Sequence, residues 1–215
     1  MANKRKYSRP NIERQLVVNS QSSIDACENF VNRTMSSLYA LDVILYYIAD
    51  GQVAEAANDE VKRIFDAKHD VFDQDVLKLS ERVEACEADE AKYTEEFSRN
   101  YKIYSPLCAS YLKLIMKFER CINLIDSLWF AGEVTSKSRT TQVMKLGRHL
   151  RNLSSQINNI SRRAMEIARN EGKESEVTEA VKEIGAEEAL AEAVIESKKN
   201  AKTVEKAEAE EEIVA

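Results

Sequence analysis

The stretch IERQLVVN, residues 12–19, decides the fold that we predict for this chain. Its second half is rich in β-favouring residues, and no other convincing strand precedes residue 99. Side chains alternate between the two faces of a strand, so inward Leu16 and Val18 place Gln15, Val17 and Asn19 on the outward face. We therefore predict one strand with a polar outer face. Residues 99–104, RNYKIY, give at most a short extended piece.

Two helices are expected directly after this strand. Ser22 or Ser23 can cap the first, whose apolar stripe runs from Ile24 to Val31. Residues 32–36 are predicted to form a turn. Ser36 or Ser37 then caps the second helix, residues 38–50, which is apolar on nearly every side and ends at Gly51. Such a helix must be buried, either in a core or in a dimer.

The rest of the chain is predicted to be helical, because Gly and Pro are scarce and Ala, Glu, Lys and Leu abound. One helix covers residues 53–67, and a longer one runs from 70 to 97 with an acidic outer face. Ser105 and Pro106 begin a third, which ends near Gly132. Ser136 begins the last, which extends to about residue 170 with apolar side chains at steps of three and four.

The expected fold class is mainly α, with four parts along the chain. Residues 1–11 form a basic arm, and residues 12–51 a strand followed by two helices. Residues 52–171 form a body of long helices. Residues 172–215 form an acidic tail, either disordered or a solvated helix, with few large apolar groups to bury.

Charge is distributed in blocks. Residues 1–20 carry five cations against one acid, and residues 133–169 carry eight bases against two acids. Residues 50–98 and 173–215 are acidic. Although the net charge is −6, the two basic blocks could form surfaces that bind a polyanion. The basic and acidic blocks could equally neutralise one another in the fold.

The sequence gives no support for an enzyme. His69 and His149 lie in no metal-ligand spacing, and there is no Gly-rich phosphate loop or nucleophile motif. The four cysteines are far apart among apolar residues, which indicates reduced core positions rather than a zinc site or disulfides. No apolar run is long enough to span a membrane, and no secretory signal is seen. We expect no cofactor, no metal, no small-molecule substrate and no membrane partner, in a bacterial cytoplasm.

The first fifty residues match the parts of a ribbon-helix-helix module in order and length. A lone strand leaves its hydrogen bonds unmade, so two chains would pair their strands and bury the apolar helices as a homodimer. The paired ribbon would then enter the major groove of double-stranded DNA. The alternative is an ordinary edge strand packed on a helical bundle, with a flexible basic tail.

This module predicts how each site residue contacts DNA. Gln15 and Asn19 would read base edges through their amides, and Val17 would touch a thymine methyl group. Backbone N–H groups near Ser36 and Ser37 would hold a phosphate at the start of the second helix. Salt-sensitive affinity would come from five cations, namely Lys4, Arg5, Lys6, Arg9 and Arg14. The basic helix 137–169 could also contact DNA, although we favour its pairing with the acidic helix 70–96.

Three segments resemble an uncharacterised protein family of integrating conjugative elements and conjugative plasmids. Residues 37–51, SLYALDVILYYIADG, are similar to its D-P-Y-A-D-x-x-L segment. Residues 104–120, YSPLCASYLKLIMKFER, look like its N-P-Y-x-Y-x-x-x-x-L-x-x-Y-D segment, and residues 15–20 like its L-T-L-H-T strand. The chain departs from the pattern at Ser37, where the family has proline, and at Leu107, where it has tyrosine.

The resemblance covers about residues 12–165 and implies transcriptional control of conjugative transfer. A plasmid-borne branch of the family includes a transfer activator with a ribbon-helix-helix region. Two functions follow as hypotheses. The first is a homodimeric, sequence-specific DNA-binding regulator, an activator of transfer genes on a mobile element. The second is a helical scaffold or accessory protein of the conjugation machinery that binds protein partners.

Overall fold

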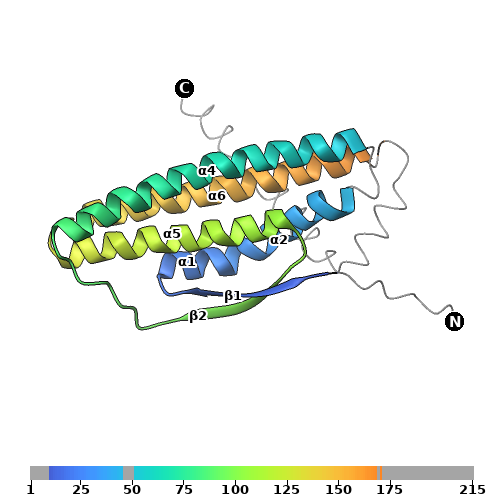
Figure 1. Ribbon diagram of the computed structural model, residues 1–215. Coiled ribbons are helices and arrows are strands. Elements are labelled where there is room, and N and C mark those ends of the chain that lie inside the picture. The colour runs from blue at the N-terminus through green and yellow to red at the C-terminus, as the bar shows by residue number, and fades with distance from the viewer. Residues whose placement is uncertain (1–9, 46–50, 169, 171–215) are drawn as a thin grey trace, which may run out of the picture.

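The computed structural model describes residues 10–45, 51–168 and 170. In this part of the chain, long helices form a bundle, and a two-stranded antiparallel sheet lies along one side of it (Figure 1). The mainly helical class is therefore confirmed. None of the described helices combines the length and the apolar composition that crossing a membrane requires.

The sheet joins two segments that lie far apart in the sequence. Strand β1, Ile12–Val18, pairs antiparallel with strand β2, Phe97–Ile103, in a register that sets Gln15 opposite Asn100. The extended piece expected at 99–104 is thus a full strand. The ribbon-helix-helix prediction, in which a lone strand pairs only with the strand of a second chain, is wrong on this point. Strand β2 of the same chain pairs with β1.

The segment after β1 is helical without a break. Helix α1, Gln21–Ala26, continues as the π-helical segment η1, Cys27–Val31, as α2, Asn32–Tyr39, and as the π-helical segment η2, Ala40–Ile44. We call residues 21–44 the N-terminal helix. It begins two or three residues earlier than predicted, after Ser20 rather than Ser22 or Ser23.

The turn predicted at residues 32–36 is wrong. The hydroxyl of Thr34 donates to the carbonyl oxygen of Phe30 at 2.9 Å, and that of Ser36 donates to the carbonyl of Asn32 at 3.1 Å. These bonds to the preceding helical turn satisfy polar side chains inside a helix. Val31, Met35 and Leu38 are buried on one side, so packing stabilises the helix across the polar run.

The apolar second half of this helix is buried in the chain's own core. Leu38, Leu41 and Leu45 are at most 1% exposed. The helix contacts α4, α5 and α6, whose bounds follow below. The chain itself therefore covers these described apolar side chains. Residues 46–50 of the predicted second helix lie outside the described residues.

Helix α4, Gly51–Ala85, is one helix where we predicted two. It ends at Ala85 and not near residue 97, because the chain turns away at Glu87, whose φ is 49°. Residues 86–96 cross the end of the bundle instead. There the N–H of Ala91 donates to the Ser127 hydroxyl at 2.9 Å, and the Tyr93 hydroxyl donates to Asp126 at 2.9 Å.

Helices α5, Pro106–Phe130, and α6, Ser136–Ala168, lie where the sequence places them. Ser105 caps α5 by accepting a hydrogen bond from the N–H of Cys108, and Gly132, with φ 81°, follows its end. Thr135 rather than Ser136 caps α6, since its hydroxyl accepts from the N–H of Ser138. The predicted acidic tail, residues 172–215, lies outside the described residues.

Three of the four cysteines occupy the core, as predicted, and Cys86 is only half-buried. Cys27, Cys108 and Cys121 are buried, and all four cysteines are free thiols. Burial raises the pKa of Cys27 and Cys121 to about 12 and that of Cys108 to about 11. These three side chains therefore act as small apolar groups in the bundle.

Candidate nucleic-acid interface

The two strands present one polar face to the outside. Because paired residues of an antiparallel ladder point to the same face, the register brings together three cross-strand pairs. These pairs are Glu13 with Lys102, Gln15 with Asn100, and Val17 with Ser98, and we call the six residues the outer ribbon face. All six side chains are exposed.

Leu16 and Val18 lie on the opposite face of β1, and their burial in the core keeps the outer ribbon face exposed. Both are at most 1% exposed and lie in the core with Tyr101 and Ile103 of β2. Buried and exposed positions alternate strictly from Gln15 to Val18. The predicted orientation of Gln15 and Val17 is thus confirmed, and Val17 is 42% exposed.

Gln15 is already oriented by its neighbour on β2. Its side-chain amide nitrogen donates to the hydroxyl of Ser98 at 2.7 Å. This bond directs the amide across the ribbon, where Asn100 lies opposite in the register. Two amides and a hydroxyl therefore stand together on one exposed surface. These are the side-chain groups that form specific hydrogen bonds with base edges.

Asn19 lies at the junction between β1 and the N-terminal helix and is only half-exposed. Its backbone N–H donates to Oε1 of Glu119 on α5 at 2.8 Å, and the N–H of Ser20 donates to the same oxygen at 3.0 Å. Ser20 also donates through its hydroxyl to Oε2 of Glu119. The buried carboxylate thus fixes where the ribbon joins the bundle.

The phosphate site predicted at Ser36 and Ser37 is wrong. Both residues lie inside the N-terminal helix, where backbone N–H groups bond to the preceding turn. The free N–H groups that bind phosphate occur only at the start of a helix. Ser36 and Ser37 are half-buried and belong to α2, not to either strand of the ribbon.

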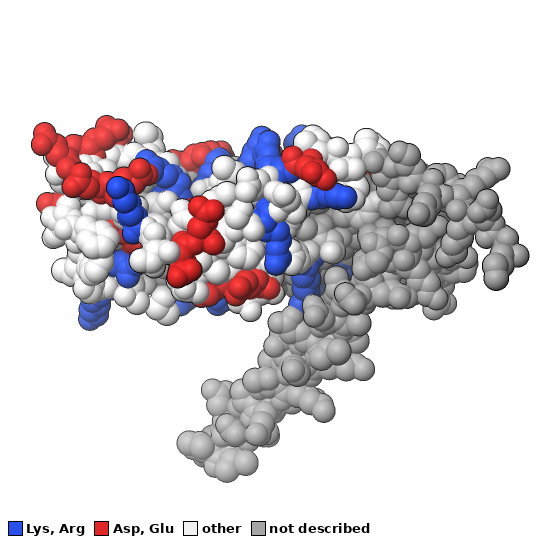
Figure 2. Space-filling view, turned by 90° about the horizontal axis from the view of Figure 1, so that it is seen from below, with Lys and Arg blue, Asp and Glu red and all other residues white. Residues whose placement is uncertain are grey.

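Of the predicted cations, Arg14 is described and exposed at the start of β1. Lys4, Arg5, Lys6 and Arg9 lie outside the described residues. Figure 2 views the molecule from the side of the strands and shows Lys and Arg interspersed with Asp and Glu, without one continuous basic patch. On the outer ribbon face, Lys102 adds positive charge and Glu13 adds negative charge. Arg14 and Arg99 lie opposite the buried Tyr101 and Leu16 in the register, and therefore on the other side of the strands.

Ser98, Asn100 and Lys102 were missed as site residues. The sequence feature that could have identified them is the alternation of apolar and polar residues within FSRNYKI, where Tyr101 and Ile103 are the buried positions. A local pattern can indicate this strand. It cannot indicate that the strand pairs with residues about eighty positions earlier, because that contact depends on the whole bundle.

The basic helix α6 does not pair its charges with the acidic helix α4 as we expected. The ion pair that the structure gives for α6 joins Arg139 to Asp126 of α5, with Nε and Oδ1 at 2.6 Å. Arg148, Arg151, Arg162 and Arg163 are exposed, and none has an ion-pair partner within the described ranges. Helices α4 and α6 do pack together, but through apolar side chains of the core.

The chain is similar in structure and sequence to a solved protein. No family model matches it, and no curated protein matches it in sequence. It does match the crystal structure of selenomethionine-containing AcaB from uropathogenic E. coli, with a TM-score of 0.76 and 29% sequence identity. The match covers 80% of this chain and 90% of the other. The resemblance predicted from residues 15–20, 37–51 and 104–120 is thus confirmed, and the chain is a structural relative of AcaB.

Proposed function

We propose that this protein is a sequence-specific DNA-binding transcriptional regulator, an activator of conjugative transfer genes on a mobile element. The observation that carries the proposal is the outer ribbon face, an exposed antiparallel ribbon with Gln15, Asn100 and Ser98 side by side. The major groove admits a two-stranded ribbon, and amide and hydroxyl groups distinguish base pairs there. The likeness to AcaB supports the resemblance to the family of conjugative elements and plasmids. That resemblance implies control of transfer genes.

The ribbon is rigidly mounted, which recognition of base edges requires. Leu16 and Val18 pack into the core, and Glu119 binds the backbone of Asn19 and Ser20 at the end of β1. The positions of the outer side chains are therefore set by the bundle before DNA is bound. Such preorganisation lowers the entropy lost on binding.

We further propose that the regulator acts as a homodimer. Strand β1 is hydrogen-bonded to β2 along one edge, and the described residues supply no strand for its other edge. An open edge is a template for pairing with another chain. Antiparallel pairing of two β1 strands would give a four-stranded sheet whose two central strands each carry a Gln15, and these two strands would form the ribbon that enters the groove.

An electrophoretic mobility-shift assay tests the proposal. The full-length protein is titrated against duplexes from the promoter regions of its own element and against a random duplex of equal length, at several salt concentrations. We expect one promoter duplex to bind about 10³-fold or more tightly than the random duplex. Equal affinity for all duplexes, or no binding, would contradict the proposal and favour a scaffold that binds protein partners.

A further inference from the structure

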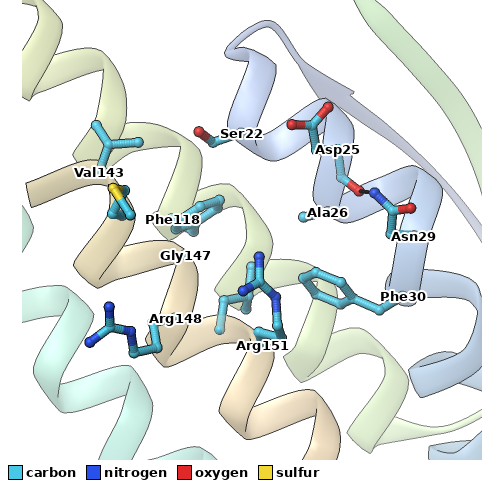
Figure 3. Close-up of a pocket in the computed structure, with 12 residues that line it drawn as sticks. Ser22, Asp25, Ala26, Asn29, Phe30, Phe118, Val143, Gly147, Arg148 and Arg151 are labelled. Atoms are coloured by element: carbon cyan, nitrogen blue, oxygen red, sulfur yellow. Dashed lines mark hydrogen bonds between the residues drawn. The ribbon is translucent and has the colours of Figure 1, made fainter. Parts of the chain in front are cut away.

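A groove runs between the N-terminal helix and α6, apart from the outer ribbon face. It encloses about 330 Å³. Figure 3 shows its two walls, with Asp25, Asn29 and Phe30 on the N-terminal helix and Arg148 and Arg151 on α6. Phe118 of α5 lies at the floor and is 1% exposed.

The groove offers an uncovered apolar surface beside positive charge. Met144, in its lining, is 60% exposed, and Phe30 and Val143 are half-buried. The side chains of Arg148 and Arg151 have no hydrogen-bond or ion-pair partner within the part of the chain that the structure describes. An apolar floor beside free guanidinium groups is suited to an acidic amphipathic helix.

Gly147 supports a helix as the occupant. It lies in the middle of α6 and lines the groove, where glycine costs about 1 kcal/mol relative to alanine. A Cβ at this position would meet no described atom within 4 Å, so packing inside the bundle does not explain the glycine. A missing side chain at a groove lets a second helix approach closely.

The chain carries a segment of matching chemistry. Residues 186–196, AEEALAEAVIE, contain four glutamates and no base. On a helix, Leu190 and Val194 are neighbours on one face, and Glu188 and Glu192 lie on the opposite one. Glu187 flanks the apolar pair, where it can approach an arginine at the wall of a groove.

The connecting chain is long enough for this segment to reach the groove. Helix α6 ends at Ala168, which lies about 26 Å along the helix from Arg151 at 1.5 Å per residue. Residues 169–185 can span up to about 56 Å when extended. We propose that residues 186–196 of the same chain bind in the groove between the N-terminal helix and α6, held by Arg148 and Arg151. This inference does not depend on DNA binding.

Photo-cross-linking of the full-length protein tests the contact. The photoreactive residue p-benzoylphenylalanine replaces Met144, and in a matched control it replaces Met116, which is 52% exposed on α5. After irradiation at low micromolar concentration, trypsin releases residues 183–198 as one peptide, because Lys182 and Lys198 flank it. We expect this peptide to be joined to the peptide containing position 144, in protein that has the mass of one chain before digestion. The yield of the same cross-link from position 116 should be at least fivefold lower.

Charge reversal distinguishes a specific contact from chance encounters of a long tail. Arg148→Glu with Arg151→Glu should lower the cross-link yield at least fivefold, and Arg162→Glu with Arg163→Glu should leave it unchanged. Adding Glu187→Lys to the first pair should restore the cross-link, which is then read on the tryptic peptide 188–198 because the new lysine adds a cleavage site. Gly147→Leu should abolish the cross-link while the circular dichroism spectrum stays that of the wild type.

Three results would overturn the proposal. Equal yields at positions 144 and 116 would show that the tail has no preferred site. Cross-links only at twice the chain mass would show that a second copy covers the groove. A yield that is insensitive to the arginine reversal would remove the proposed basis of binding.

Discussion

The buried carboxylate of Glu119 binds Ser20 twice, through its backbone N–H at 3.0 Å and through its hydroxyl. The two residues are 99 positions apart in sequence, and the contact ties the end of β1 to α5. Glu119 is 7% exposed and also accepts from the N–H of Asn19. Glu119, together with the buried Leu16 and Val18, therefore sets the position of the ribbon on the bundle.

Replacing Glu119 with Gln should destabilise the protein and loosen the ribbon. Hydrogen bonds to a charged acceptor contribute about 1.5–3 kcal/mol each to stability. Because the neutral amide of Gln would keep only part of this contribution, we expect the free energy of unfolding to fall by about 1–3 kcal/mol. Urea denaturation followed by circular dichroism measures it. Glu133→Gln, at an exposed position, is the control and should change stability by less than about 0.5 kcal/mol. Equal stability of both variants would show that the junction does not depend on the charge.

The homodimer is tested by dilution. Sedimentation velocity from about 100 µM to 1 µM should show twice the chain mass at the upper end, since the open edge of β1 can pair with a second copy. Addition of the specific duplex should shift the equilibrium further toward two chains, because a ligand that binds the dimer stabilises it. A monomer at every concentration, with and without duplex, would contradict this part of the account.

The cysteines should differ sharply in reactivity. Cys27, Cys108 and Cys121 are buried, and burial raises their pKa values to about 11–12, so little thiolate forms near neutral pH. Cys86 is half-buried near the end of α4. In the native protein at pH 8, Ellman's reagent should label one thiol rapidly, and Cys86→Ser should remove that signal. Rapid labelling of more than one thiol would show that the core opens easily.

His69 should make the protein less stable in mild acid. Burial and the nearby Lys117 hold the pKa of His69 below its ordinary value of 6.5, outweighing the opposing effects of Asp73, Asp66 and the hydrogen bond with Ser110. Between 6.5 and that lower pKa the unfolded chain binds more protons than the folded chain, so stability falls as the pH falls. His69→Gln should reduce the loss of stability between pH 7 and pH 5, measured by urea denaturation at each pH. A pH dependence equal to that of the wild type would show that His69 does not contribute.

Much of the bundle could be predicted from the sequence, because its signals are local. Ser105, Pro106 and Gly132 bound α5, and the periodic apolar residues of α6 indicate one long helix. The outward positions of Gln15 and Val17 follow from alternation within β1. These features depend on neighbours within a few residues, and the structure confirms them.

The errors arose where distant contacts decide the local structure. Residues 32–36 are polar enough for a turn, but Val31, Met35 and Leu38 pack into the core and keep the helix intact. Residues 86–97 carry helical spacing, yet Asp126 and Ser127 of α5 bind Tyr93 and Ala91 in a loop. The partner of β1 could not be inferred either. Strand β2 lies far from β1 in the sequence, after α4 and that loop, so their pairing depends on how the whole chain folds.

The central claim, that the outer ribbon face reads DNA, is tested by salt titrations of binding to the specific and to a random duplex. Gln15→Ala and Asn100→Ala should each weaken specific binding by about 1–3 kcal/mol and leave random binding and both salt slopes nearly unchanged. Gln156→Ala, an exposed amide on α6, is the matched control and should bind as the wild type does. The account is contradicted if both ribbon variants keep wild-type affinity for the specific duplex, while charge reversal of Arg148, Arg151, Arg162 and Arg163 abolishes binding. The basic face of α6 would then be the DNA-binding surface.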